Sequence, residues 1–230
     1  MTFTLEDIVP WGRSLSEYRR MFALGEDDLR LRIIGCADGP ASFNTELARK
    51  GLRSVSCDPL YSFSVNQIRV RIEETYDQMI EETRRNWSEF LWEDIKSVEE
   101  LGRIRLEAMT FFLEDFERGK SEGRYVSSAL PWLPFHDCAF DLALCSHYLF
   151  LYTDHLTEAF HVHAIVEMCR VASEVRIFPL LALGSRPSAY VEPVSAELEH
   201  RGFSVSIELV PYEFQRGGNK MMRVRRSLAA

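Results

Sequence analysis

The chain has 230 residues, of which 46% are hydrophobic and 27% charged, as in an ordinary soluble protein. This length predicts one domain with a continuous core. Aspartate and glutamate outnumber lysine and arginine by 35 to 27, which gives a formal net charge of −8. Because a nucleic-acid footprint needs a basic face, this balance argues against DNA or RNA as the main partner. No apolar run reaches the roughly 18 residues that a membrane span needs.

The N-terminal sequence and the cysteines indicate the cellular compartment of the protein. Residues 1–14 lack the basic start and apolar core of a signal peptide. The five cysteines are an odd number, and no two of them form a C-x-x-C pair. We therefore expect reduced, mostly buried cysteines in a cytoplasmic protein that contacts no membrane.

The most informative segment begins with a predicted buried strand at residues 32–34, which runs into a glycine-bearing turn, Gly35–Gly39. Glycines let the backbone turn sharply and approach a ligand closely. The helix that follows points its free N–H groups at the same crevice. About twenty residues after the turn, Asp58 ends a second predicted strand, where a carboxylate can accept hydrogen bonds from two ribose hydroxyls. This layout predicts a site for an adenosine-containing molecule.

The turn does not identify that molecule. The dinucleotide pattern G-x-G-x-x-G is absent, since Ala37 and Ser42 occupy glycine positions, and no G-x-x-x-x-G-K-[ST] loop is present. An ordinary strand-to-helix turn is the alternative interpretation.

Residues 64–119 form a long helical tract after the second predicted strand. Apolar residues recur there at three- and four-residue steps, and Ser97 with Glu100 predicts a capping box that starts a second helix. An insertion at this point emerges on the ligand side of a parallel sheet. We expect a helical lid that shapes a substrate pocket; a helical pair that only enlarges the core is the alternative.

From residue 121 onward the alternation of strands and helices resumes. The pattern predicts a strand at 125–127, a loop and buried strand within 133–146, a helix at 155–171, a strand at 174–179, a helix at 191–201, and two antiparallel strands at 203–212 and 221–225. A Gly-Gly turn is expected to join the last two strands.

These features resemble the class I S-adenosylmethionine-dependent methyltransferases. The similarity covers residues 31–225 and rests on the G-C-x-x-G turn, the acid after the second strand, the sequence LPFHDCAFDLAL and the final antiparallel pair. It implies an α/β, Rossmann-like fold with a seven-stranded sheet in the order 3-2-1-4-5-7-6, in which only strand 7 is antiparallel. Helices would cover both faces, and 64–119 would be a helical insertion after strand 2.

The resemblance implies S-adenosylmethionine as cofactor and S-adenosylhomocysteine as product. The turn would hold the methionine part, Asp58 the ribose, and Ala129-Leu130 the adenine edge. The implied cofactor-binding residues are Gly35, Cys36, Ala37, Asp38, Gly39, Asp58, Pro59, Ala129, Leu130 and Ser146.

Two positions depart from the family pattern. Ile33 stands where an acid is common, and we hypothesise that Asp38 supplies a carboxylate near the methionine amino group instead. Residues 127–129 lack the acid that often bonds the adenine, so a hydroxyl or backbone group must replace it.

The candidate catalytic residues follow the fourth predicted strand. His147 could act as a base, and Tyr148 could orient the acceptor or cover the sulfonium. His147 hydrogen-bonded at a strand end without a catalytic role is the alternative. Candidates for the substrate pocket are Tyr61, Phe63, Gln67 and Arg71. Arg71 would suit a carboxylate substrate, or it is a solvated arginine on a helix face.

We therefore expect a methyltransferase that acts on a small-molecule acceptor. The N/D-P-P-Y/F tetrapeptide of amino-methylating nucleic-acid enzymes is absent. His155, His161 and His163 lack the spacing of metal ligands on one helix face, so no metal is expected. The alternatives are a silent methyltransferase-like module that binds the cofactor or a partner, and a nicotinamide-dependent oxidoreductase. The sequence does not predict the oligomeric state.

Overall fold

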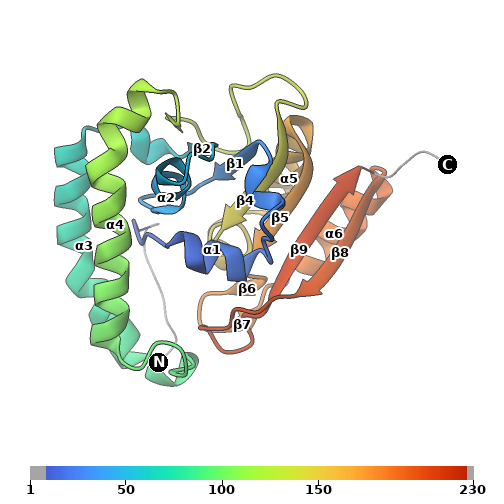
Figure 1. Ribbon diagram of the computed structural model, residues 1–230. Helices are drawn as coiled ribbons and strands as arrows, with labels where there is room; N and C mark the ends of the chain where they lie inside the picture. The colour runs from blue at the N-terminus through green and yellow to red at the C-terminus, as the bar shows by residue number, and fades with distance from the viewer. Residues whose placement is uncertain (1–8, 227–230) are drawn as a thin grey trace.

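The computed structural model describes residues 9–226, and its centre is a seven-stranded sheet with helices on both faces (Figure 1). The strands lie in the order β3-β2-β1-β4-β5-β9-β8. β9 runs antiparallel to both of its neighbours, whereas the other neighbouring pairs are parallel. This confirms the predicted class I methyltransferase topology. The sheet strands are β1 Ile33–Cys36, β2 Ser54–Cys57, β3 Tyr125–Val126, β4 Phe140–Ser146, β5 Ala172–Phe178, β8 Phe203–Leu209 and β9 Lys220–Arg226.

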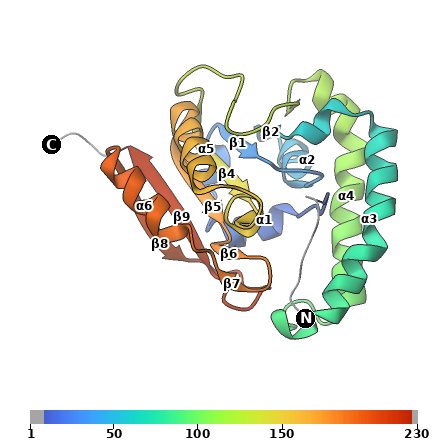
Figure 2. The ribbon, with the colours of Figure 1, turned by 180° about the vertical axis from the view of Figure 1, so that it is seen from behind.

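Each face of the sheet buries a separate apolar cluster. Helices α1 (Leu15–Met21) and α2 (Phe43–Arg49) cover one face. Helices α5 (Glu158–Val171) and α6 (Val191–His200) cover the other and lie in front of the sheet in Figure 2. The central strands β1 and β4 are buried on both faces, which explains their nearly continuous apolar sequences. Of the five free cysteines, only Cys138 is exposed.

Element boundaries differ from the sequence predictions by a few residues. β1 extends through Cys36, so Gly35 lies within the strand and not in the turn. The helix expected from residue 155 starts at Glu158, because the Thr157 side chain accepts a hydrogen bond from the Phe160 N–H at 3.2 Å and caps it. A small hairpin of β6 (Leu181–Ala182) and β7 (Arg186–Pro187) was not predicted.

The insertion contains two long helices, α3 (Val65–Arg85) and α4 (Val98–Ser121), which pack against each other on one side of the molecule (Figure 1). α4 also contacts α2 and β3, and an aromatic cluster of Tyr61, Phe112, Phe116 and Tyr125 fills this junction. The Ser97 hydroxyl caps α4, but Glu100 accepts from the Lys96 N–H and not from that of Ser97. The predicted capping box is therefore only half formed. None of the helices within residues 9–226 is long and apolar enough to span a membrane.

Glu174 fastens the C-terminal strands to the parallel part of the sheet. Its carboxylate accepts hydrogen bonds from Arg176 on its own strand at 2.6 Å, and from Arg223 at 2.8 Å and Arg225 at 2.7 Å on β9. Burial alone would raise the pKa of Glu174, but the hydrogen bonds from Arg223 and Arg176 outweigh it and lower that pKa to about 2.

We expect Glu174→Gln to lower the free energy of unfolding by about 1–3 kcal/mol at pH 7, because it leaves the buried guanidinium of Arg176 with one carboxylate fewer. The folded-state pKa lies below the ordinary value. The contribution of Glu174 is therefore complete above about pH 4.5 and fades as the pH falls toward 2. Urea unfolding at pH 7 and pH 3 measures this. Glu197→Gln, in the exposed Glu197–Arg201 pair, should change stability by less than about 0.5 kcal/mol. Equal effects of both variants at pH 7 would contradict the assignment.

Candidate functional site

A cavity of about 650 Å³ opens at the carboxyl ends of β1, β2 and β4. Its walls come from the turn after β1, residues 128–133, the segment after β4, the helical insertion and the C-terminal loop before β9. All but two of the predicted site residues line it; the exceptions are Gly35 and Tyr61. The structure therefore brings the turn after β1, Asp58 and the His147-Tyr148 pair together around one cavity.

Gly35 does not line the cavity; its lack of a side chain leaves room for the Asp38 carboxylate. A Cβ atom on Gly35 would lie 1.9 Å from Asp38 Oδ2, so only glycine lets this carboxylate fold back over the strand. There Asp38 accepts hydrogen bonds from the Tyr18 hydroxyl at 2.7 Å and the Ser56 hydroxyl at 2.6 Å. Burial raises the pKa of Asp38 to about 6, against the opposing effect of these two hydrogen bonds and with a smaller contribution from the Asp58 charge.

Asp58 holds the glycine turn and the next segment in place. Its Oδ2 accepts from the Gly39 N–H at 2.9 Å, and its Oδ1 accepts from the Leu60 N–H at 2.8 Å. Since a carboxylate oxygen offers two lone pairs, each oxygen keeps one for a further donor. Burial raises the pKa of Asp58, and the two N–H groups oppose that rise. Gly39 has φ +54° and open space where a side chain would begin, so the turn presents bare backbone.

Tyr61 lies in the core and not in the substrate pocket. Its side chain is fully buried in the aromatic cluster beside α4, and its hydroxyl donates to the Gly39 carbonyl at 2.7 Å. The residue supports the turn from behind. Near the expected adenine edge, the Ser128 hydroxyl donates to the Trp132 carbonyl at 2.9 Å, and Ala129 pairs with Trp132 through the backbone. Ala129 and Leu130 line the cavity there.

His147 lies directly after β4 with its ring on the cavity wall. Its φ of +51° is unusual for a residue with a side chain. The backbone N–H of His147 donates to the Phe178 carbonyl at 2.6 Å. Ring atom Nδ1 lies 2.9 Å from the Ser146 hydroxyl. Burial lowers the pKa of His147 well below its ordinary value, and the charges of Arg13 and Arg105 lower it further. The imidazole is therefore neutral near pH 7, and the same causes make it a weaker proton acceptor than an exposed histidine.

Tyr148, the second candidate catalytic residue, is half-buried beside His147. Burial raises the pKa of its hydroxyl to about 12, so it is protonated at neutral pH. The remaining candidates lie on the insertion. Phe63 is 49% exposed, the Gln67 side chain accepts from the Ser64 N–H at 3.0 Å, and the Arg71 side chain is 45% exposed with Glu74 at 3.7 Å. These three line the cavity without a buried polar role.

Sequence reasoning missed a buried ionic network on the cavity wall. The Arg105 side chain is 1% exposed and donates to Glu17 Oε2 at 2.6 Å. The Tyr212 hydroxyl donates to Glu17 Oε1 at 3.0 Å. Arg13 also lines the cavity. A capping box of Ser14 and Glu17 was readable in the sequence, but it does not reveal partners 88 and 195 residues away.

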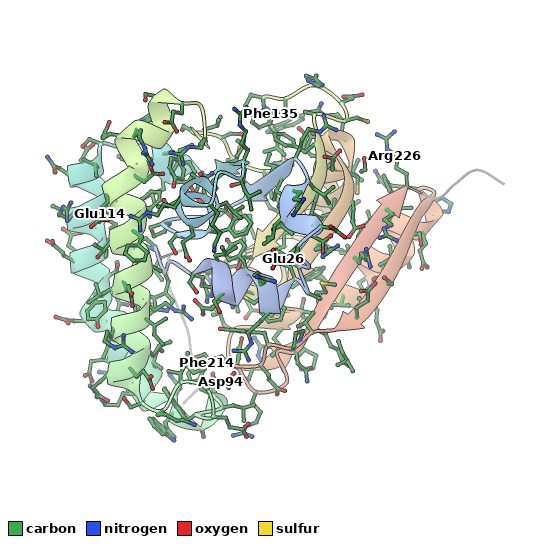
Figure 3. The ribbon with its side chains drawn as sticks, viewed as in Figure 1. Glu26, Asp94, Glu114, Phe135, Phe214 and Arg226 are labelled. Carbon is green, nitrogen blue, oxygen red and sulfur yellow. The ribbon has the colours of Figure 1, made fainter. Side chains whose placement is uncertain are left out.

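The cavity is closed at one end by a contact between the insertion and the C-terminal loop. The Leu91 N–H donates to the Phe214 carbonyl at 2.7 Å, and the Phe90 and Phe214 rings stack with centroids 5.0 Å apart. Figure 3 shows Asp94 and Phe214 at the same end of the molecule. The run from Val210 to Gly218, whose role the sequence did not explain, thus helps to enclose the cavity together with the insertion.

We expect Asp38→Asn to change the pH dependence of stability. The folded-state pKa of about 6 exceeds the ordinary 3.8, so the wild type loses stability as the pH rises from about 4 to about 6. That loss amounts to about 3 kcal/mol, at 1.36 kcal/mol per pKa unit. Asparagine carries no charge, so the difference in unfolding free energy should move in its favour by this order between pH 4 and pH 8. A difference that stays constant with pH would show that Asp38 is not a buried titrating group.

No family model matches the chain. Solved structures that it resembles include the mitomycin 7-O-methyltransferase, with 13% identity and a TM-score of 0.48 over 93% of this chain and 54% of that one. The S-adenosylmethionine-dependent methyltransferase SibL shows 15% identity and a TM-score of 0.46, over 93% and 56%. A methyltransferase from Methanosarcina mazei shows 14% identity and a TM-score of 0.44, over 87% of this chain and 94% of that one. The chain thus spans little more than half the length of the first two. Our fold assignment rests on strand order and direction.

One relative is close in sequence. The protein MJ0045 of Methanocaldococcus jannaschii, described as uncharacterized, is 34% identical over 223 residues, which cover 96% of this chain and 98% of that protein. The alignment extends over nearly the full length of both chains. The chain belongs to the same protein family as MJ0045.

Proposed function

We propose that the protein is an S-adenosylmethionine-dependent methyltransferase that acts on a small-molecule acceptor. One observation carries this proposal. In a sheet of class I methyltransferase topology, Asp58 stands at the carboxyl end of β2, lines the cavity, and keeps one acceptor position on each carboxylate oxygen.

The residues present fit this cofactor. Asp58 can accept two ribose hydroxyls, and the bare backbone at Gly39 leaves room for a ligand beside the turn. Asp38 offers a buried carboxylate to an ammonium group, although the family's usual acid is replaced by Ile33. Ala129 and Leu130 supply an apolar wall for an adenine.

The protein's own chemical task is then limited. When bound, S-adenosylmethionine would supply a methyl group on a positively charged sulfur, with that sulfur as the leaving group for an acceptor's lone pair. The cavity walls hold the acceptor in line with that bond. If the acceptor is a hydroxyl or an ammonium, the neutral imidazole of His147 takes its proton. Tyr148 is protonated and can donate a hydrogen bond that orients the acceptor.

The Ser146 hydroxyl sets which nitrogen of His147 is the base. It lies 2.9 Å from Nδ1 and also interacts with the Tyr18 hydroxyl, which itself donates to Asp38. When Asp38 is ionised, the Tyr18 hydroxyl donates to Asp38 and the Ser146 hydroxyl donates to Tyr18. The Ser146 oxygen then accepts from His147. Nδ1 then carries the proton, and Nε2 is the free basic atom.

We expect micromolar binding of both S-adenosylmethionine and S-adenosylhomocysteine in calorimetry. Asp58→Ala should weaken binding by about 1–3 kcal/mol, as for a lost charged hydrogen-bond partner, or about 5- to 150-fold. Asp141→Ala removes a carboxylate that pairs with Arg32 and does not line the cavity, so it serves as the matched control. Tight binding of NADH with no binding of either sulfur nucleoside would favour the oxidoreductase alternative.

We further expect His147→Gln to slow transfer of a labelled methyl group to acceptors in a cell extract by about 10²–10⁴-fold, the usual contribution of a positioned base. Binding of S-adenosylhomocysteine should stay within a factor of about three, because the substitution leaves Asp58 and the turn intact. Undiminished transfer would remove His147 from the mechanism. A wild type that binds cofactor but labels no acceptor would support the silent-module alternative.

A further inference from the structure

Two arginine side chains without a surface role belong to the lining of the cavity. They are Arg13 and Arg105, and the charges of both lower the pKa of His147. Arg105 is paired with Glu17 at 2.6 Å. Arg13 has no such partner within residues 9–226: its Nη1 donates to the Trp11 carbonyl at 3.1 Å, and no described carboxylate oxygen lies within 4.0 Å of its guanidinium.

Glu17 does not neutralise both arginines. Its Oε2 accepts from the Ser14 N–H and hydroxyl and from Arg105, and its Oε1 accepts from the Tyr212 hydroxyl, whereas Arg13 donates to neither oxygen. Glu17 therefore lies near two guanidinium charges and is hydrogen-bonded to only one of them. Burial and the nearby charge of Arg105 lower the pKa of Arg13 to about 10, which reflects the cost of that arrangement.

The two guanidinium groups also have unused donors. Arg13 Nε and Arg105 Nε are buried, and neither has a hydrogen-bond acceptor within the described part of the chain. A buried donor without an acceptor costs free energy, and a buried unpaired charge costs more. An anionic oxygen group in the cavity would compensate the charge of Arg13, because a guanidinium matches the geometry of a carboxylate or a phosphate.

We infer that Arg13, together with Arg105, binds an anionic oxygen group, carboxylate or phosphate, on the methyl acceptor. This inference rests on the proposed function and specifies its substrate class. The remaining wall near His147 is apolar and includes Tyr148, Phe178 and Leu183. The acceptor therefore combines an apolar body with one anionic end, and its nucleophilic atom faces His147.

This assignment differs from the role suggested for Arg71 by the sequence. The Arg71 side chain is 45% exposed and lies 3.7 Å from Glu74. An exposed, paired arginine gains little from an additional anion, because water already solvates it. Arg71 is thus a matched control for Arg13: it is an arginine that lines the same cavity but is more exposed and has a carboxylate nearby.

The test measures ligand binding by calorimetry with the full chain, using benzoate, phenyl phosphate and the neutral benzamide as probes. We expect one of the two anions to bind at least tenfold more tightly than benzamide. Arg13→Gln should abolish that preference, Arg13→Lys should retain part of it, and Arg71→Gln should leave it unchanged. The preferred anion identifies carboxylate or phosphate as the group recognised.

Equal binding of benzoate, phenyl phosphate and benzamide, no binding of either anion, or an unchanged preference in Arg13→Gln would overturn the inference. Each measurement is repeated with S-adenosylhomocysteine present and in Asp58→Ala. Anion binding through Arg13 without any S-adenosylhomocysteine binding would refute the proposed function and leave the anion site standing. Binding of S-adenosylhomocysteine without any anion binding through Arg13 would refute the anion site alone.

Discussion

The site depends on a buried carboxylate, that of Asp38, held above a glycine that leaves it room. Its hydrogen bonds from Tyr18 on α1 and Ser56 on β2 join three segments that are separated in the chain. Because an ionised carboxylate is costly to bury, both donors are needed, and they fix α1 against the sheet. α1 in turn carries Glu17, whose pairing with Arg105 connects the sheet to the insertion.

Acidic and basic side chains both line the resulting cavity. Asp38 and Asp58 surround the glycine turn, where the proposed cofactor presents hydroxyl donors and a positive ammonium group. Arg13 and Arg105 also line the cavity, and their charges lower the pKa of His147. The same two positive charges that would attract an anionic acceptor also keep the imidazole of His147 unprotonated. These charges thus connect substrate recognition with the protonation state of His147, and they also weaken its imidazole as a base.

The sequence predicted what depends on local order along the chain. Strand and helix alternation predicted the α/β class, and the resemblance to class I methyltransferases implied the strand order. The positions that follow the first, second and fourth strands predicted the turn, Asp58 and His147. It could not predict partners far apart in sequence. Tyr61 follows Asp58 closely, but a hydrogen bond to Gly39 and packing on α4 place it in the core. Arg13 resembles any surface arginine until its distance from all described carboxylates is known.

The most direct test of this account is a crystal structure of the protein with S-adenosylhomocysteine. We predict the ribose hydroxyls on the Asp58 carboxylate, the ammonium group near Asp38, and the sulfur facing the part of the cavity that contains His147 and Tyr148. A ligand bound elsewhere, or bound here with its ribose away from Asp58, would contradict the account, because the proposed function rests on that carboxylate.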